Sequence, residues 1–148
     1  MNVQRLATRT LAAGGSLLLV VAAIHLAVTP ELRDLFLRSS GGSRSMRFWL
    51  APFLLNHVVV AILLVPVGIT TILAARAARA GAPWARAVAL TNALSVLALP
   101  VALVTLMDRG YFGAKPFLVA AILVTVAGVA LVAAALALWS RSNDGAKP

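Results

Sequence analysis

The stretch Leu11–Val28, LAAGGSLLLVVAAIHLAV, decides the fold of this chain. It contains no Asp, Glu, Lys or Arg, and an apolar run of this length is typical of a helix that crosses a membrane. At 1.5 Å per residue it would measure roughly 27 Å, close to the thickness of the hydrocarbon core. It is too long for the apolar region of a signal peptide and no A-x-A site follows it, so we expect a retained first span.

The composition extends this interpretation to the whole chain. Of 148 residues, 61% are hydrophobic and 11% are charged, with a mean hydropathy of +0.97, whereas a soluble domain carries about 25% charged residues. We therefore predict a single membrane domain over residues 1–148. The chain has no cysteine, which excludes disulfides, thiolate catalysis, iron–sulfur ligation and cysteine-type zinc sites.

Further apolar runs predict an all-α fold, an antiparallel bundle of four transmembrane helices joined by short connections. The predicted spans cover residues 10–29, 53–75, 87–107 and 117–139. Between the first two spans, residues 30–47 are predicted to hold a short amphipathic helix in the membrane interface. Thr29–Pro30 would start that helix, and Leu32, Leu35 and Phe36 would share its apolar face. The tail 140–148 is small and polar, and we predict that it is disordered.

The basic residues lie at the ends of the apolar runs. The net charge is +9, from 13 Lys and Arg against 4 Asp and Glu, but no continuous basic helix forms, so contact with lipid head groups explains the charge better than nucleic acid does. Trp49 and Tyr111 fall on one side of the predicted membrane and Trp84 and Trp139 on the other, as an aromatic belt would. Basic residues divide almost evenly between the sides, and we predict that both termini are cytoplasmic.

Small and hydroxylated residues recur at helical spacing and predict where the spans pack, because such residues let membrane helices approach closely. The predicted packing positions are Gly15 and Ala22 in the first span, Ala61, Gly68 and Thr71 in the second, Thr91 and Ser95 in the third, and Gly128 in the fourth.

His25 and His57 are the only histidines, and each lies inside an apolar run, where an ionisable group is a candidate functional site. Span lengths place them at similar depth near the same face of the membrane, on neighbouring helices. They could ligate a transition metal or a haem, or bind a lipophilic ligand by hydrogen bonds. A metal held by two histidines alone is under-ligated, and it would need Glu31, Asn56 or a bound water to complete its ligands. Glu31 and Asn56 therefore join the candidate ligand-binding set. The alternative is that both histidines join helices by hydrogen bonds.

No catalytic constellation is present: the chain has no HExxH, no phosphate loop and no paired carboxylates. The sequence therefore favours an accessory or interaction subunit whose partners are the bilayer and other membrane subunits or copies of itself. One alternative is a membrane-embedded protein that binds haem, a metal or a small lipophilic ligand through His25 and His57. A second alternative is an oligomeric transporter of small solutes.

Overall fold

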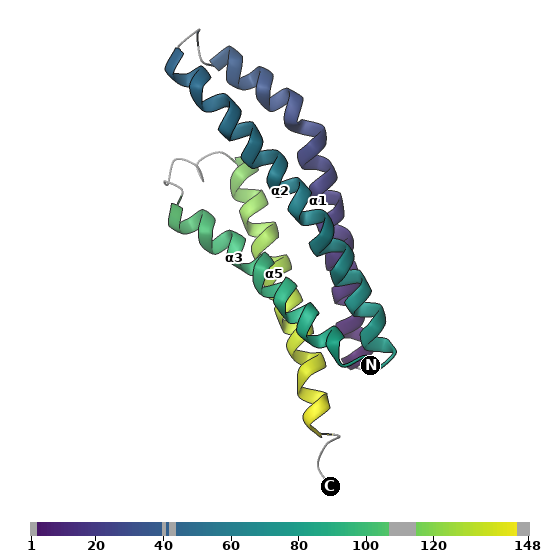
Figure 1. The fold of residues 1–148 in the computed structure, drawn as a ribbon. Coiled ribbons are helices and arrows are strands. Elements are labelled where there is room, and N and C mark those ends of the chain that lie inside the picture. Colours follow the sequence, from purple (N-terminus) through teal and green to yellow (C-terminus); the bar gives the residue numbers. More distant parts are fainter. Residues whose placement is uncertain (1–2, 40, 42–43, 107–114, 145–148) are drawn as a thin grey trace. The chain divides into compact units, whose positions relative to one another are not determined.

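A computed structural model describes residues 3–39, 41, 44–106 and 115–144, and the regular secondary structure in this part of the chain is all helical. It consists of four helices: α1 (Val3–Ser39), α2 (Arg44–Arg79), α3 (Trp84–Leu106) and α5 (Lys115–Asp144) (Figure 1). Each is long and apolar enough to cross a membrane. The chain is thus a small multi-pass membrane protein, and the prediction of four apolar membrane helices is confirmed. Tyr111, one of the predicted belt residues, lies outside the described residues.

A separate interfacial helix after Pro30 is not present, because α1 continues without a break to Ser39. Pro30 cannot donate a backbone hydrogen bond to the carbonyl of Leu26. Membrane helices tolerate the loss of one such bond. In the turn before the proline, Thr29 Oγ1 donates to the His25 carbonyl oxygen at 2.7 Å. With 37 residues, α1 is roughly 55 Å long and exceeds the hydrocarbon core of about 30 Å.

The other helices also extend beyond the predicted spans. α2 already begins at Arg44, so residues 44–47 of the predicted interfacial segment belong to it. α5 continues to Asp144; residues 140–144 of the predicted tail are therefore helical, and residues 145–148 lie outside the described part. Apolar runs locate the spans. The helices themselves begin and end where capping and backbone geometry allow, and these positions lie outside the apolar runs.

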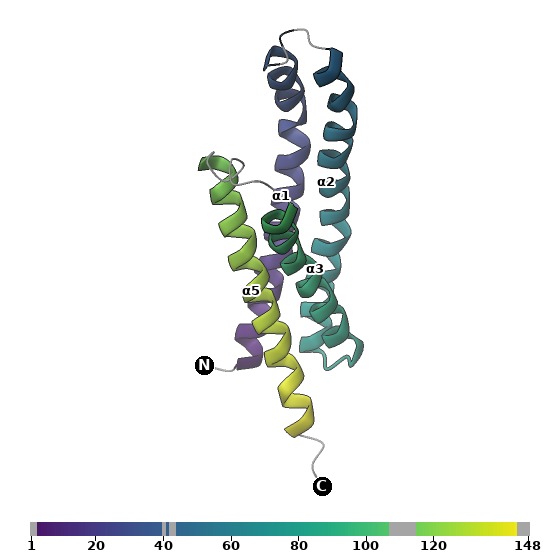
Figure 2. The same cartoon turned by 90° about the vertical axis from the view of Figure 1, so that its left-hand side faces the viewer.

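The chain divides into two compact units, which we describe separately. Unit 1 comprises Met1–Gly15 and Thr70–Pro148, and unit 2 comprises Ser16–Ile69. Within unit 1, α3 and α5 pack against each other and lie side by side in both views (Figures 1 and 2). A Cβ added at Gly128 of α5 would lie 3.1 Å from the Leu97 Cα of α3. The two helices therefore approach closely where glycine leaves the space.

The predicted packing positions divide into two groups. The buried ones are Gly15, Ala22, Ala61, Gly68, Thr71 and Gly128. Thr91 and Ser95 are exposed, and α3 instead buries Ala85, Ala89, Ala93, Val96 and Pro100. At 100° per residue, this alanine-rich face lies on roughly the opposite side of α3 from Thr91 and Ser95. Both faces carry small residues at the same period, so the period alone does not identify the buried one.

A glycine turn joins α2 to α3. Gly81 has φ 77°, the left-handed conformation that glycine adopts without a steric cost. The Ala82 N–H donates to the Ala77 carbonyl at 3.0 Å and the Gly81 N–H to the Ala78 carbonyl at 3.2 Å. This is the Schellman pattern that ends a helix. It places the end of α2 within a few residues of the first turn of α3.

Asn92 provides the polar contact between α2 and α3. Its Nδ2 donates to Thr70 Oγ1 at 2.8 Å and to Thr71 Oγ1 at 3.0 Å, and all three residues belong to unit 1. Lipid offers no hydrogen bonds to replace these, so the amide holds the two helices together.

We predict that Asn92→Ala lowers the free energy of unfolding by about 1 kcal/mol, since interhelical hydrogen bonds in membranes average about 0.6 kcal/mol each. Reversible denaturation of the full chain in mixed micelles, followed by circular dichroism, measures the change. Asn56→Ala is the matched control, because Asn56 is exposed and makes no hydrogen bond with any described residue. Equal losses in the two variants would contradict the assignment.

Candidate functional site: the histidine pair

Two imidazole rings, from His25 of α1 and His57 of α2, stack on each other inside unit 2. Their centroids are 4.6 Å apart and their planes differ by 25°. Both side chains are partly exposed. The sequence predicted that the two histidines lie at similar depth on neighbouring helices, and the structure brings their rings into contact.

Each ring uses one nitrogen to bond a backbone carbonyl of α1. His57 Nε2 lies 3.0 Å from the His25 carbonyl oxygen, and His25 Nδ1 lies 3.0 Å from the Val21 carbonyl oxygen. Carbonyl oxygens only accept hydrogen bonds, so both of these nitrogens carry the proton. In the neutral rings, His25 Nε2 and His57 Nδ1 are then the acceptor nitrogens.

The His25 carbonyl is the centre of this arrangement, because it accepts from two side chains. Thr29 Oγ1 donates to it at 2.7 Å from the same helix, and His57 Nε2 donates to it at 3.0 Å from α2. Sequence reasoning placed Thr29 as a helix cap and missed this role. The signal was its position, four residues after His25 and directly before Pro30, where a threonine can bond back to the preceding turn.

A second aromatic contact joins the same two helices in unit 2. The rings of Phe36 and Phe53 stack with centroids 5.7 Å apart and planes 27° apart. Aromatic pairs of this kind contribute about 0.5–1.5 kcal/mol beyond the area they bury. The histidine pair is therefore one of two ring contacts between α1 and α2 among the described residues of this unit.

Glu31 and Asn56, the other members of the predicted ligand set, are not brought into the pair. Both are exposed, and among the described residues no three His, Cys, Asp or Glu side chains could together hold a metal ion. A metal on His25 Nε2 and His57 Nδ1 would need its further ligands from water or another molecule. A haem between the two rings would require them to separate, because stacked rings with centroids 4.6 Å apart leave no space for a porphyrin.

Comparisons with known proteins add no relative. No protein-family model matches the chain, and neither a curated protein nor a solved structure does. Its function is therefore argued from its own residues.

We predict that His57→Phe and His57→Ala separate the two contributions of this ring. Phenylalanine keeps a ring to stack on His25 but loses the Nε2–H donor, so the free energy of unfolding should fall by about 0.6 kcal/mol. Alanine loses both contacts and should cost about 0.5–1.5 kcal/mol more. Denaturation in mixed micelles measures both variants.

Val59→Ala, an exposed position on α2, is the control for loss of side-chain volume. If both His57 variants unfold like this control, the pair does not join the helices.

Proposed function

We propose that this protein is an accessory or interaction subunit of a membrane assembly, with four helices in an antiparallel bundle. One observation carries the proposal: both imidazole N–H groups bond to backbone carbonyls of α1. The His57 N–H bond and the stacking of the two rings join α1 to α2, while the His25 N–H bonds within its own helix. A contact between helices is enough to explain the two histidines. A catalytic or ligand-binding site, in which further polar groups would converge on the rings, is not needed to explain them.

The contacts within each unit support the antiparallel arrangement. In unit 2, His25 meets His57 while the later residue Phe36 meets the earlier residue Phe53. Residue numbers rise along α1 as they fall along α2, as they do in a helical hairpin. In unit 1, the short turn at Gly81 joins α2 to α3, which is typical of antiparallel neighbours.

The exposed small face of α3 supports an interaction role. It consists of Thr91, Ser95, Ala98, Ala102 and Thr105, all exposed. Two of its three hydroxyls bond to carbonyls of their own helix, Ser95 Oγ to Thr91 at 2.9 Å and Thr105 Oγ1 to Val101 at 2.9 Å. Another helix can therefore approach without leaving these two hydroxyls unsatisfied, and small residues permit a close approach. We assign this face to a helix of another membrane subunit or of a second copy.

We predict that a photo-crosslinking amino acid in place of Ser95 yields a protein adduct of defined mass in native membranes. The same substitution at Val104, also exposed on α3 but away from the small face, should yield adducts with lipid. Mass spectrometry of the purified adducts measures both outcomes. An adduct of twice the chain mass identifies a second copy, and any other constant mass identifies a different subunit.

Lipid adducts alone at both positions would overturn the proposal. It would also fail if the purified protein carried a Soret band or a stoichiometric metal that disappeared in both His25→Ala and His57→Ala. That result would assign the acceptor nitrogens His25 Nε2 and His57 Nδ1 to ligand binding. The protein would then be the haem-, metal- or ligand-binding protein of the first alternative, which the contact between the two rings favours.

We further propose that both termini are cytoplasmic, with the α2–α3 turn on the same side and the end of α1 on the opposite side. The chain has no cysteine, so single cysteines can report accessibility without background. We predict that a membrane-impermeant maleimide labels Ser39→Cys in intact cells and labels Ala80→Cys only after permeabilisation. The reverse pattern would invert the orientation.

A further inference from the structure

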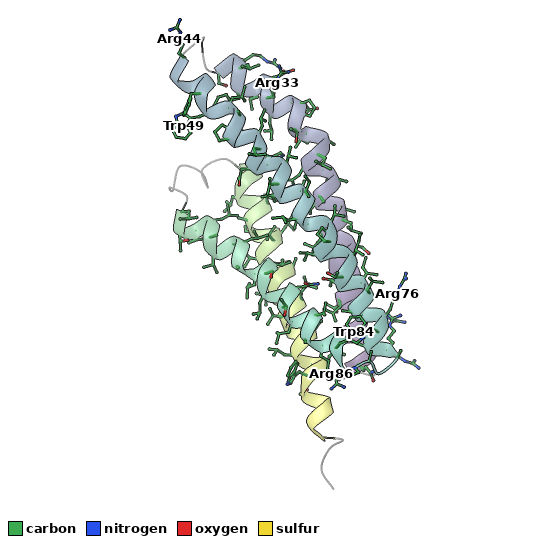
Figure 3. The ribbon with its side chains drawn as sticks, in the orientation of Figure 1. Arg33, Arg44, Trp49, Arg76, Trp84 and Arg86 are labelled. Atoms are coloured by element: carbon green, nitrogen blue, oxygen red, sulfur yellow. The ribbon has the colours of Figure 1, made fainter. Side chains whose placement is uncertain are left out.

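Five arginines gather at one end of unit 1. They come from three helices: Arg5 and Arg9 from the start of α1, Arg76 and Arg79 from the last turn of α2, and Arg86 from the first turn of α3. Figure 3 shows Arg76, Trp84 and Arg86 at the same end of this unit. We call these five residues the arginine cluster.

Hydrogen bonds between α1 and α2 bring the cluster together. Arg79 Nε donates to Thr8 Oγ1 at 3.1 Å, and Gln4 Nε2 donates to the Ala78 carbonyl at 3.3 Å. Thr8 is fully buried, and its hydroxyl donates in turn to the Arg5 carbonyl at 3.2 Å. These bonds fix the first turns of α1 against the last turn of α2, and they hold Arg79 through its Nε while its two Nη groups are left for other acceptors.

No described side chain of unit 1 carries a compensating negative charge. Its described side chains include the five arginines and no Asp or Glu. Unit 2 differs, because Arg33, Arg38 and Arg44 are accompanied there by Glu31 and Asp34. The two predicted sides of the membrane carry nearly equal numbers of basic residues. Only the arginine cluster of unit 1, however, lacks carboxylates among the described side chains of its unit. Closely spaced guanidinium groups repel one another unless anions neutralise them.

We infer that the arginine cluster binds the phosphate of an anionic phospholipid such as phosphatidylglycerol. The cluster lies at the ends of membrane-spanning helices, where the phosphates of the lipid head groups are the most abundant anions. The planar guanidinium donates two parallel hydrogen bonds to phosphate oxygens, which a lysine ammonium cannot do. Trp84 is 52% exposed beside the cluster, and tryptophan is the side chain most typical of the head-group level.

Native mass spectrometry of the detergent-purified full chain tests the inference, with phosphatidylglycerol and phosphatidylcholine of the same acyl chains as probes. We expect a clear preference for phosphatidylglycerol. Arg5→Gln/Arg76→Gln should weaken that binding by about fivefold per arginine, since each basic residue near an anionic surface contributes about 1 kcal/mol. Both side chains are exposed and neither holds Thr8, so the helix contact at Arg79 remains.

Arg33→Gln/Arg44→Gln is the matched control, because it removes the same charge from unit 2 and should leave phosphatidylglycerol binding unchanged. Arg5→Lys/Arg76→Lys should fall between wild type and the glutamine variant, and it tests the cluster even if the glutamine variant does not fold. Equal losses in the cluster and control variants would overturn the inference, as would an absence of preference between the two lipids. Displacement of the lipid by equimolar inorganic phosphate would also overturn it, because the site would then recognise the free anion and not a lipid.

Discussion

Hydrocarbon contains no water, so each polar group within a span must find its partner inside the protein. Several hydroxyls in the described spans meet this constraint by bonding to carbonyls of their own helix, as Thr29, Ser95 and Thr125 do. Among the described residues, no buried side-chain nitrogen or oxygen lacks a partner. Among the described residues, short hydroxyl side chains therefore donate hydrogen bonds within their own helix, and only longer side chains donate to a second helix.

The longer side chains supply the polar contacts between helices. In unit 1, Asn92 reaches the threonines of α2 and Arg79 reaches Thr8 of α1. In unit 2, His57 reaches a carbonyl of α1 next to the turn that Pro30 weakens. That carbonyl also accepts from Thr29 Oγ1 of its own helix. An imidazole suits the position, since it supplies an N–H donor and a flat face that stacks on His25.

The sequence predicted the four apolar spans and placed the two histidines on neighbouring helices, because both follow from the lengths of apolar runs. It could not predict how α1 passes Pro30. Threonine followed by proline is equally typical of a helix start and of a membrane helix in which the threonine bonds back. Nor could it identify the buried face of α3, because Thr91 and Ala89 belong to small-residue faces of the same period. The neighbouring helices determine which face is buried, and the periodicity of one helix gives no information about its neighbours.

Polar side chains of this protein differ in whether their hydrogen bonds and charges are satisfied within the chain. Within the spans, His57 and Asn92 direct their donors to a neighbouring helix of the chain, so these residues hold the helices together. At the end of unit 1, Arg79 is held in place by Thr8, yet the positive charge around it has no described carboxylate to neutralise it. The exposed guanidinium groups at this end are therefore available to an anion from outside the chain. The proposed lipid site therefore rests on charge at a helix end, and the proposed helix contact rests on the small residues of α3.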